Sequence, residues 1–165
     1  YINIIKLLIL NLSNYYTLIL LIEVFMYSSL FLSSFLAATL IPAQSEAILS
    51  FQLASNKEDL IYLILLATFG NVFGALVNWY LGKFFIHYKG KKWFPIKADK
   101  LAKGEKYYKK YGRVSLLLSW MPIIGDPITL VAGILKEPIW SFLILVTIAK
   151  GLRYIFVVVV TLNII

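Results

Sequence analysis

The fold is decided by two short stretches, IPAQSEAI at residues 41–48 and MPIIGDPI at residues 121–128. In each stretch an apolar residue precedes a proline, a small residue follows the proline by three positions, and a carboxylate follows it by four. A proline inside a helix removes a backbone hydrogen bond, so Pro42 and Pro122 each predict a break in an apolar helical segment. The two motifs lie 80 residues apart, which indicates an internal repeat.

Three apolar segments around these motifs, residues 15–36, 60–85 and 139–165, are long enough to cross a bilayer, which takes about 20 apolar residues. The segments that contain the motifs, residues 37–53 and 114–135, are too short or too broken. Each is predicted to enter the membrane as helix, break and helix and to return on the same side. Because the chain is 61% hydrophobic and only 15% charged, we predict an all-α, polytopic membrane protein.

One complete crossing separates the two broken segments, so they are predicted to enter from opposite faces of the membrane. Two opposed re-entrant helical hairpins in an inverted repeat are a design of transporters. We predict a single transmembrane domain over residues 15–165, with the first repeat at 15–87 and the second at 113–165. Residues 1–14 form an N-terminal segment to which the sequence assigns no role.

A basic loop at residues 88–112 joins the two repeats. Eleven of the sixteen Lys and Arg residues lie from Lys83 to Arg113, which predicts a cytoplasmic loop by the positive-inside rule. The net charge of +8 therefore reflects topology and anionic lipid headgroups, and no nucleic-acid partner is predicted. Within the loop, Leu101 and Tyr108 fall near helical spacing among lysines, which favours a short helix on the membrane surface.

Glu46 and Asp126 are the carboxylates of the two motifs, and each is predicted to lie near the tip of a hairpin, deep in the membrane. An ionised carboxylate at that depth is costly unless it is paired. One interpretation is that both residues only stabilise the start of the helix that follows the break. The other is that they handle substrate or protons, since ionisable groups inside a membrane are commonly functional.

Lys150 and Arg153 are their candidate partners, because they lie near the middle of residues 139–165 and, three positions apart, on one helix face. One interpretation is a structural ion pair with Glu46 or Asp126. The other is recognition of an anionic headgroup, since the arginine fork matches phosphate oxygens. Both interpretations can hold if the carboxylate pairs with the cation until the substrate displaces the carboxylate.

Further residues are predicted to support this site. Leu60–Phe85 carries a stripe of small and polar residues, in which Gly70, Gly74 and Gly82 predict close helix packing. The two asparagines of the stripe are open to either packing or a role in the site. The predicted supporting residues are Pro42, Pro122, Gly125, Asn71 and Asn78.

The chain offers little for metal or acid–base chemistry, because it has one histidine, His87, and no cysteine. Metal centres draw on these residue types, and nucleophilic catalysis needs a base beside the nucleophile. We therefore predict no metal, no cofactor and no enzymatic activity.

The sequence resembles the DedA superfamily of SNARE-associated or VTT-domain proteins, and within it the small YqaA-like branch. The resemblance is carried by FLSSFLAATLIPAQSEAIL at 31–49, ATFGNVFGALVNWYLGKFF at 67–85, KKYGRVSLLLSWMPIIGDPITLVAGILK at 109–136 and IAKGLRY at 148–154. It implies two opposed re-entrant helices, a bacterial inner-membrane location and membership among proteins that move lipids. Some members are implicated in recycling undecaprenyl phosphate or phosphatidylethanolamine, with proton dependence.

The chain also departs from the typical family pattern. Typical members carry a glutamate where this chain has Ala37, and arginines where it has Ser119 and Gly125. Of the typical site residues only Glu46 carries over, while Asp126 and the two cations belong to the YqaA-like pattern.

From the charged residues and the resemblance together we expect a flippase-like carrier of an anionic lipid. Its expected partners are membrane lipids such as a polyprenyl phosphate or a phospholipid, with protons as the candidate coupling ion. Two alternatives stand beside it: a proton- or ion-coupled transporter of a small solute, and a membrane-assembly protein without transport activity. The sequence leaves the oligomeric state open.

Overall fold

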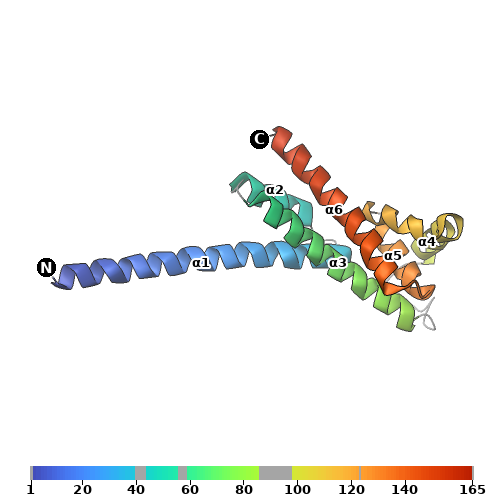
Figure 1. The fold of residues 1–165 in the computed structure, drawn as a ribbon, viewed down its shortest axis with the longest axis horizontal. Helices are drawn as coiled ribbons and strands as arrows, with labels where there is room; N and C mark the ends of the chain where they lie inside the picture. Colours follow the sequence, from blue (N-terminus) through green and yellow to red (C-terminus); the bar gives the residue numbers. More distant parts are fainter. Residues whose placement is uncertain (1, 40–43, 56–58, 86–97, 123, 165) are drawn as a thin grey trace.

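The computed structural model describes residues 2–39, 44–55, 59–85, 98–122 and 124–164, and every regular element in these ranges is a helix (Figure 1). In chain order the elements are α1 (Ile2–Ala38), α2 (Ser45–Ser55), α3 (Leu60–Phe85), α4 (Ala98–Tyr111), the 3-10 helix η2 (Gly112–Trp120), α5 (Gly125–Ile134) and α6 (Ile139–Ile164).

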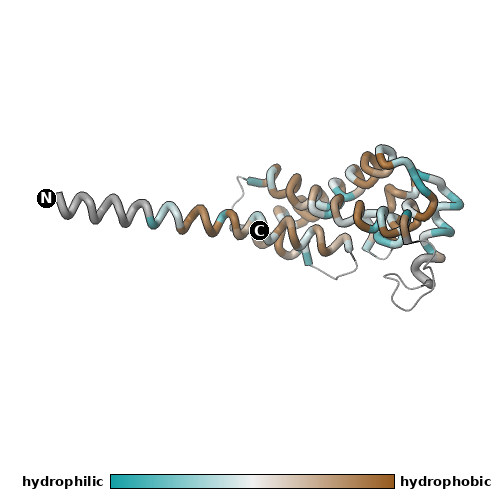
Figure 2. Tube along the Cα trace, turned by 90° about the horizontal axis from the view of Figure 1, so that it is seen from below, coloured by the Kyte–Doolittle hydropathy of each residue, from teal (hydrophilic) through white to brown (hydrophobic). Residues whose placement is uncertain are grey.

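Three helices are long and apolar enough to cross a membrane, namely α1 over Asn14–Ala38, α3 over Leu60–Phe84 and α6 over Ile139–Ile164. They match the three predicted crossings. Figure 2 shows apolar residues along these helices and hydrophilic ones around α4. The prediction of an all-α fold with helices that can span a membrane is confirmed.

The first broken segment differs from its predicted bounds. Residues 37–53 were expected to hold both arms of a hairpin, but α1 runs without interruption from Ile2 to Ala38. The predicted crossing at 15–36 and the first arm are thus one helix, which also continues across residue 14. The physical reason is local, because α1 contains neither proline nor glycine. Pro42 lies outside the described residues.

α2 returns alongside α1. The amide Nε2 of Gln52 in α2 donates a hydrogen bond to the backbone oxygen of Met26, at 2.7 Å. At its other end, α2 begins at Ser45, only seven positions after the last residue of α1, Ala38. The C-terminal part of α1 and the whole of α2 therefore form an antiparallel pair, whereas the N-terminal half of α1 projects away from the other helices (Figure 1).

α3 is the central helix, and glycines bring it close to its neighbours. A Cβ atom on Gly74 would lie 2.3 Å from the backbone oxygen of Phe35 in α1, and one on Gly82 would lie 2.1 Å from that of Leu130 in α5. Neither position can hold a side chain without separating the two helices. The predicted packing role of the stripe glycines is therefore confirmed.

The second broken segment contains the expected break. η2 ends at Trp120, a turn contains Pro122, and α5 begins at Gly125. The arm before the break is a 3-10 helix of nine residues, a length rare for this tighter helix. The sequence had indicated a helix there without distinguishing the 3-10 from the α form.

α2 lies along α6 and runs in the same direction. The hydroxyls of Ser45 and Tyr154 lie 3.1 Å apart, and those of Ser50 and Thr161 lie 2.8 Å apart. Both residue numbers increase together along the contact. α2 therefore leads from the middle of α6 toward the C-terminal end of that helix.

α5 lies along α3 and runs in the same direction as α3. Asn78 lies beside Thr129, and Gly82 lies beside Leu130 and Ile134. α3 itself is antiparallel to α6, because Asn71 contacts Tyr154 while Trp79 contacts Phe142. α2 and α5 consequently point in opposite directions from the middle of the bundle.

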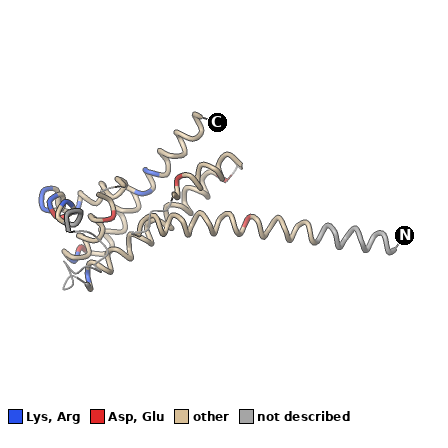
Figure 3. Tube along the Cα trace, turned by 180° about the vertical axis from the view of Figure 1, so that it is seen from behind, with Lys and Arg blue, Asp and Glu red and all other residues tan. Residues whose placement is uncertain are grey.

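α4 forms the described part of the basic loop at 88–112, whose residues 88–97 lie outside the described ranges. It packs on α5, where a Cβ atom on Gly104 would lie 3.2 Å from the backbone of Pro127. Tyr108 is buried and its hydroxyl donates to Glu137. Burial and this hydrogen bond raise the pKa of Tyr108, which stays protonated. Figure 3 shows Lys and Arg gathered at this end of the molecule.

Candidate functional site

A layer of buried polar residues separates the two apolar cores of the bundle. On α6, Phe142 and Val146 belong to one core, and Tyr154 and Val158 belong to the other. Lys150 lies between them and is almost fully buried. The other buried polar residues include Ser34, Ser45, Thr68, Asn71, Asn78, Ser119 and Thr129.

Lys150 pairs with Asp126. Its Nζ lies 3.9 Å from Oδ1 of Asp126, and its side chain is 2% exposed, against 24% for the aspartate. Asp126 comes from the first turn of α5, where the helix dipole favours a negative charge. The pair therefore compensates a cation that lies deep in the protein.

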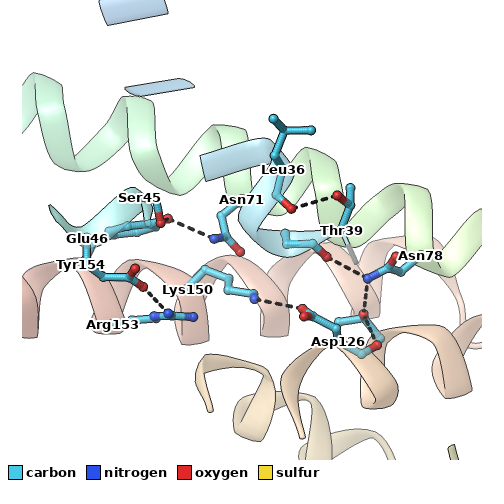
Figure 4. Close-up of polar contacts among 12 residues, drawn as sticks. Leu36, Thr39, Ser45, Glu46, Asn71, Asn78, Asp126, Lys150, Arg153 and Tyr154 are labelled. Carbon is cyan, nitrogen blue, oxygen red and sulfur yellow. Dashed lines mark hydrogen bonds and ion pairs between the residues drawn. The ribbon is translucent and has the colours of Figure 1, made fainter. Parts of the chain in front are cut away.

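Arg153 pairs with Glu46, to which its Nη2 donates a hydrogen bond. Glu46 comes from the first turn of α2. This pair is more accessible, since the arginine side chain is 19% exposed and the glutamate side chain 31%. Figure 4 shows both cations of α6 reaching toward the carboxylates.

The two pairs lie together because the starts of α2 and α5 meet near the middle of α6. Two cations three positions apart face two carboxylates, so the four formal charges of the cluster sum to zero. The structure thus brings together all four residues that the sequence proposed for one site. It also assigns partners, which the sequence left open. Their handling of substrate or protons stays a prediction.

An apolar groove opens beside this cluster, between η2 and α6. Its volume is about 420 Å³. Leu117 and Trp120 of η2 line one side, and Leu152 and Phe156 of α6 line the other, with Arg153 among them. Arg153 is therefore the charged group of an otherwise apolar groove, and it contacts Glu46 from there.

Among the described residues, no group of three or more His, Cys, Asp or Glu side chains is placed to hold a metal ion. The site consists of ion pairs and hydroxyl and amide groups.

The VTT domain family model matches residues 16–162 of the chain, which is nearly the whole of it. The chain belongs to this family. It is 40% identical to the inner membrane protein YqaA of Escherichia coli over 135 residues, which cover 82% of this chain and 90% of that protein. The predicted DedA or VTT resemblance, its YqaA-like branch and the inner-membrane location are confirmed.

Two further relatives extend the comparison. An uncharacterised protein of Haemophilus influenzae is 31% identical over 134 residues, covering 76% of this chain and 81% of its own length. A Lactococcus lactis protein described as alkaline phosphatase-like is 30% identical over 118 residues, covering 64% of this chain and 55% of its own length. No solved structure matches the chain.

The departures from the typical VTT pattern are built into the packing. Gly125 is buried at the start of α5, and a Cβ atom there would lie 2.4 Å from the backbone oxygen of Ser119. Ser119 is itself fully buried. The arginines that typical members carry at these two positions would not fit this arrangement. Pro122 lies exposed in the turn, and Pro42 is outside the described residues.

Asn71 supports the site through a tyrosine that sequence reasoning missed. Its Nδ2 donates to the hydroxyl of Tyr154 at 2.9 Å, and this hydroxyl also lies 3.1 Å from that of Ser45. Tyr154 is fully buried and follows Arg153 directly. It therefore ties α3 and the start of α2 to the helix that carries both cations. The sequence did indicate that Tyr154 could belong to the site, because it lies four residues after Lys150 and therefore on the same helix face.

Asn78 plays the corresponding part beside α5. Its Nδ2 donates to the backbone oxygen of Ala38 at 2.8 Å and lies 3.3 Å from the hydroxyl of Thr129. Thr129 in turn donates to the backbone oxygen of Asp126 at 2.8 Å. Asn78 thus joins the end of α1 to the first turn of α5. Thr129 is the second supporting residue that the sequence did not indicate.

Proposed function

We propose that the chain is a carrier that moves an anionic lipid with a phosphate headgroup across the membrane. The observation that carries the proposal is the position of Arg153, which pairs with Glu46 and also lines an apolar groove. An amphipathic anion needs both features, a cation for its headgroup and an apolar surface for its chain. A solute without a chain would have no use for the groove.

In the proposed cycle, the phosphate displaces Glu46 from Arg153. Glu46 is then left as an unpaired carboxylate inside the membrane, a charge that is costly until it is compensated. In this cycle a proton is the proposed compensating ion on headgroup entry, and headgroup release restores the ion pair. Lys150 and Asp126 stay paired, so this second pair keeps its charges compensated and does not change partners.

The proposed arrangement in the membrane is that of two opposed re-entrant hairpins in an inverted repeat, with α2 and α5 as the second arms. The opposite directions of α2 and α5 support it, as does the meeting of their starts at the middle of α6. The basic loop at 88–112 then lies in the cytoplasm.

Single-cysteine labelling tests this arrangement, because the chain has no cysteine of its own. In cells treated with an impermeant reagent, a cysteine in place of the exposed Ser55 should be labelled from outside. Cysteines in place of Lys106 and Lys136 should react only after the membrane is opened. Labelling of Ser55→Cys and Lys106→Cys from the same side would reject the opposed arrangement.

Reconstitution tests the transport proposal. Liposomes containing the protein should move a fluorescent polyprenyl phosphate between leaflets faster than empty liposomes, and should leave the matching neutral polyprenol unmoved. Arg153→Ala should abolish the difference, whereas Arg113→Ala, which removes an exposed cation outside the site, should not. Equal rates for phosphate and alcohol, or for the Arg153→Ala variant and the unaltered chain, would contradict the proposal.

The same liposomes separate transport from catalysis. One relative is described as alkaline phosphatase-like, so the recovered lipid should be checked for loss of phosphate. We expect the lipid to keep its phosphate, since hydrolysis needs a base beside the nucleophile. The single histidine of the chain, His87, is not part of α6, the helix that carries Lys150 and Arg153. Release of phosphate at a rate that depends on Arg153 would make the site enzymatic.

A further inference from the structure

A small pocket lies at the far end of α2 from Glu46, where the end of α2 and the start of α3 meet the middle part of α1. Its volume is about 160 Å³. Polar groups from all three segments line it, namely Glu23 and Tyr27 of α1, Gln52 and Ser55 of α2, and Asp59 directly before α3. Two of these five residues carry carboxylates, and none is basic.

The hydrogen atoms of the polar groups around this pocket are already donated to the protein. The Tyr27 hydroxyl donates to Oδ2 of Asp59 at 2.7 Å. The Ser55 hydroxyl donates to the backbone oxygen of Phe51 at 3.0 Å. The hydroxyl oxygens that remain can therefore act only as acceptors toward the pocket.

Gln52 supplies the observation that points to a ligand. Its Nε2 donates to the backbone oxygen of Met26 at 2.7 Å, and the residue is only 2% exposed. Its amide oxygen Oε1 is buried and has no hydrogen-bond partner among the described residues. A buried carbonyl oxygen without a donor is costly, so the pocket calls for a species that such an oxygen can bind.

We propose that this pocket binds a hard divalent cation of the calcium type. Calcium takes carboxylate and amide oxygens together with waters, in flexible geometry. Glu23 and Asp59 supply two negative charges, which match one divalent ion, and Gln52 supplies the neutral oxygen that otherwise has no partner. The ion would join α1, α2 and the start of α3 at the end opposite the basic loop. The site is separate from the lipid site and does not depend on lipid transport.

Terbium luminescence tests the proposal, because Tb³⁺ replaces Ca²⁺ and is sensitised by a nearby tyrosine. Tyr27 lines the pocket, and its ring lies 5.0 Å from that of Tyr62. After chelation, the purified full chain in detergent should give a saturable signal that Ca²⁺ displaces, with half-displacement at about 10⁻⁴–10⁻³ M. The same Ca²⁺ range should raise the thermal unfolding midpoint, and equal ionic strength in NaCl should not.

Two variants locate the ion. Glu23→Gln and Asp59→Asn should each weaken Tb³⁺ binding by about tenfold or more. Glu105→Gln, which removes a carboxylate on α4, should leave binding unchanged. Glu23 is exposed, so its variant keeps the test valid even if Asp59→Asn does not fold. The absence of saturable, Ca²⁺-displaceable signal, or a signal unchanged in Glu23→Gln, would overturn the proposal.

Discussion

The starts of α2 and α5 carry the same kind of group, a carboxylate paired with a cation of α6, but in different surroundings. At α5 the cation Lys150 is 2% exposed. At α2 the cation Arg153 is 19% exposed and lines an apolar groove. The repeated sequence motif thus yields one enclosed pair and one accessible pair.

The backbone packing around the two pairs also differs, and it is tighter at α5 than at α2. α5 is held against α3 by glycine, since a Cβ atom on Gly133 would lie 2.0 Å from the backbone oxygen of Trp79. α2 has no glycine and meets α6 through hydroxyl contacts such as Ser50 with Thr161. The difference indicates that the α5 half is the fixed frame and that the exchange of partners takes place in the α2 half.

Asp126→Asn should have the largest effect on stability, because it leaves the buried Lys150 without its carboxylate. An uncompensated charge at membrane depth costs about 2.5–3.5 kcal/mol. We expect a loss of this order in the free energy of unfolding, measured by thermal unfolding in detergent together with the folded yield. Adding Lys150→Met should recover most of the loss, since it removes the stranded cation. A double variant as unstable as the single one would show that the charge is not the cause.

Gly133→Ala should come next, because its methyl group would overlap backbone rather than a flexible side chain. Overpacked cores lose about 1–3 kcal/mol, and we expect a value at or above the middle of that range. The matched control is Gly151→Ala on α6, whose Cβ would lie 3.8 Å from Thr68 in ordinary contact. Equal thermal midpoints for the two variants would show that the close approach of α5 to α3 at Gly133 does not hold α5 in place.

Much of the fold could be predicted because its signals are local. The three crossings follow from uninterrupted apolar runs, and the break at Pro122 follows from the proline itself. The continuity of α1 was not predicted, because the boundary between the crossing and the first arm was placed at residue 36, whereas no proline or glycine interrupts the helix before Ala38. The 3-10 geometry of η2 depends on packing against α5 and α6, which no local pattern encodes.

The candidate site could be predicted in its members but not in its contacts. Each of the four charged residues stands in an apolar segment, and the cost of an isolated charge there demands a partner. The pairing of each carboxylate with its cation depends on where α2 and α5 lie along α6, and the sequence does not give these positions. The contacts of Tyr154 with Ser45 and Asn71 depend on helix rotations that one sequence does not fix.

Tyr154→Phe should have a smaller effect. It removes the hydroxyl that forms hydrogen bonds with both Asn71 and Ser45, and each hydrogen bond contributes about 1 kcal/mol net. We expect a loss of about 2 kcal/mol in the free energy of unfolding for the two bonds. Because the tyrosine positions the α2 half, the rate of lipid transport should fall further than the loss of folded protein alone would explain. Tyr80→Phe, at an exposed tyrosine of α3, is the control for removing a hydroxyl.

Arg153→Ala should have the smallest effect on stability. The Arg153–Glu46 pair is more accessible than the Lys150–Asp126 pair, and pairs of greater exposure contribute less, down to about 1 kcal/mol at a water-exposed surface. The thermal midpoint should therefore drop only slightly, and adding Glu46→Gln should restore it without restoring transport. A loss as large as that of Asp126→Asn would mean that the two pairs are equally structural.

The most direct test exchanges the members of the accessible pair, in the double variant Glu46→Arg with Arg153→Glu. The ion pair is retained, so the thermal midpoint should stay near that of the unaltered chain. The groove would then be lined by a carboxylate, which repels a phosphate headgroup. The measurement is the rate at which this variant moves polyprenyl phosphate in reconstituted liposomes. The account predicts the rate of empty liposomes, whereas transport at the rate of the unaltered chain would contradict it.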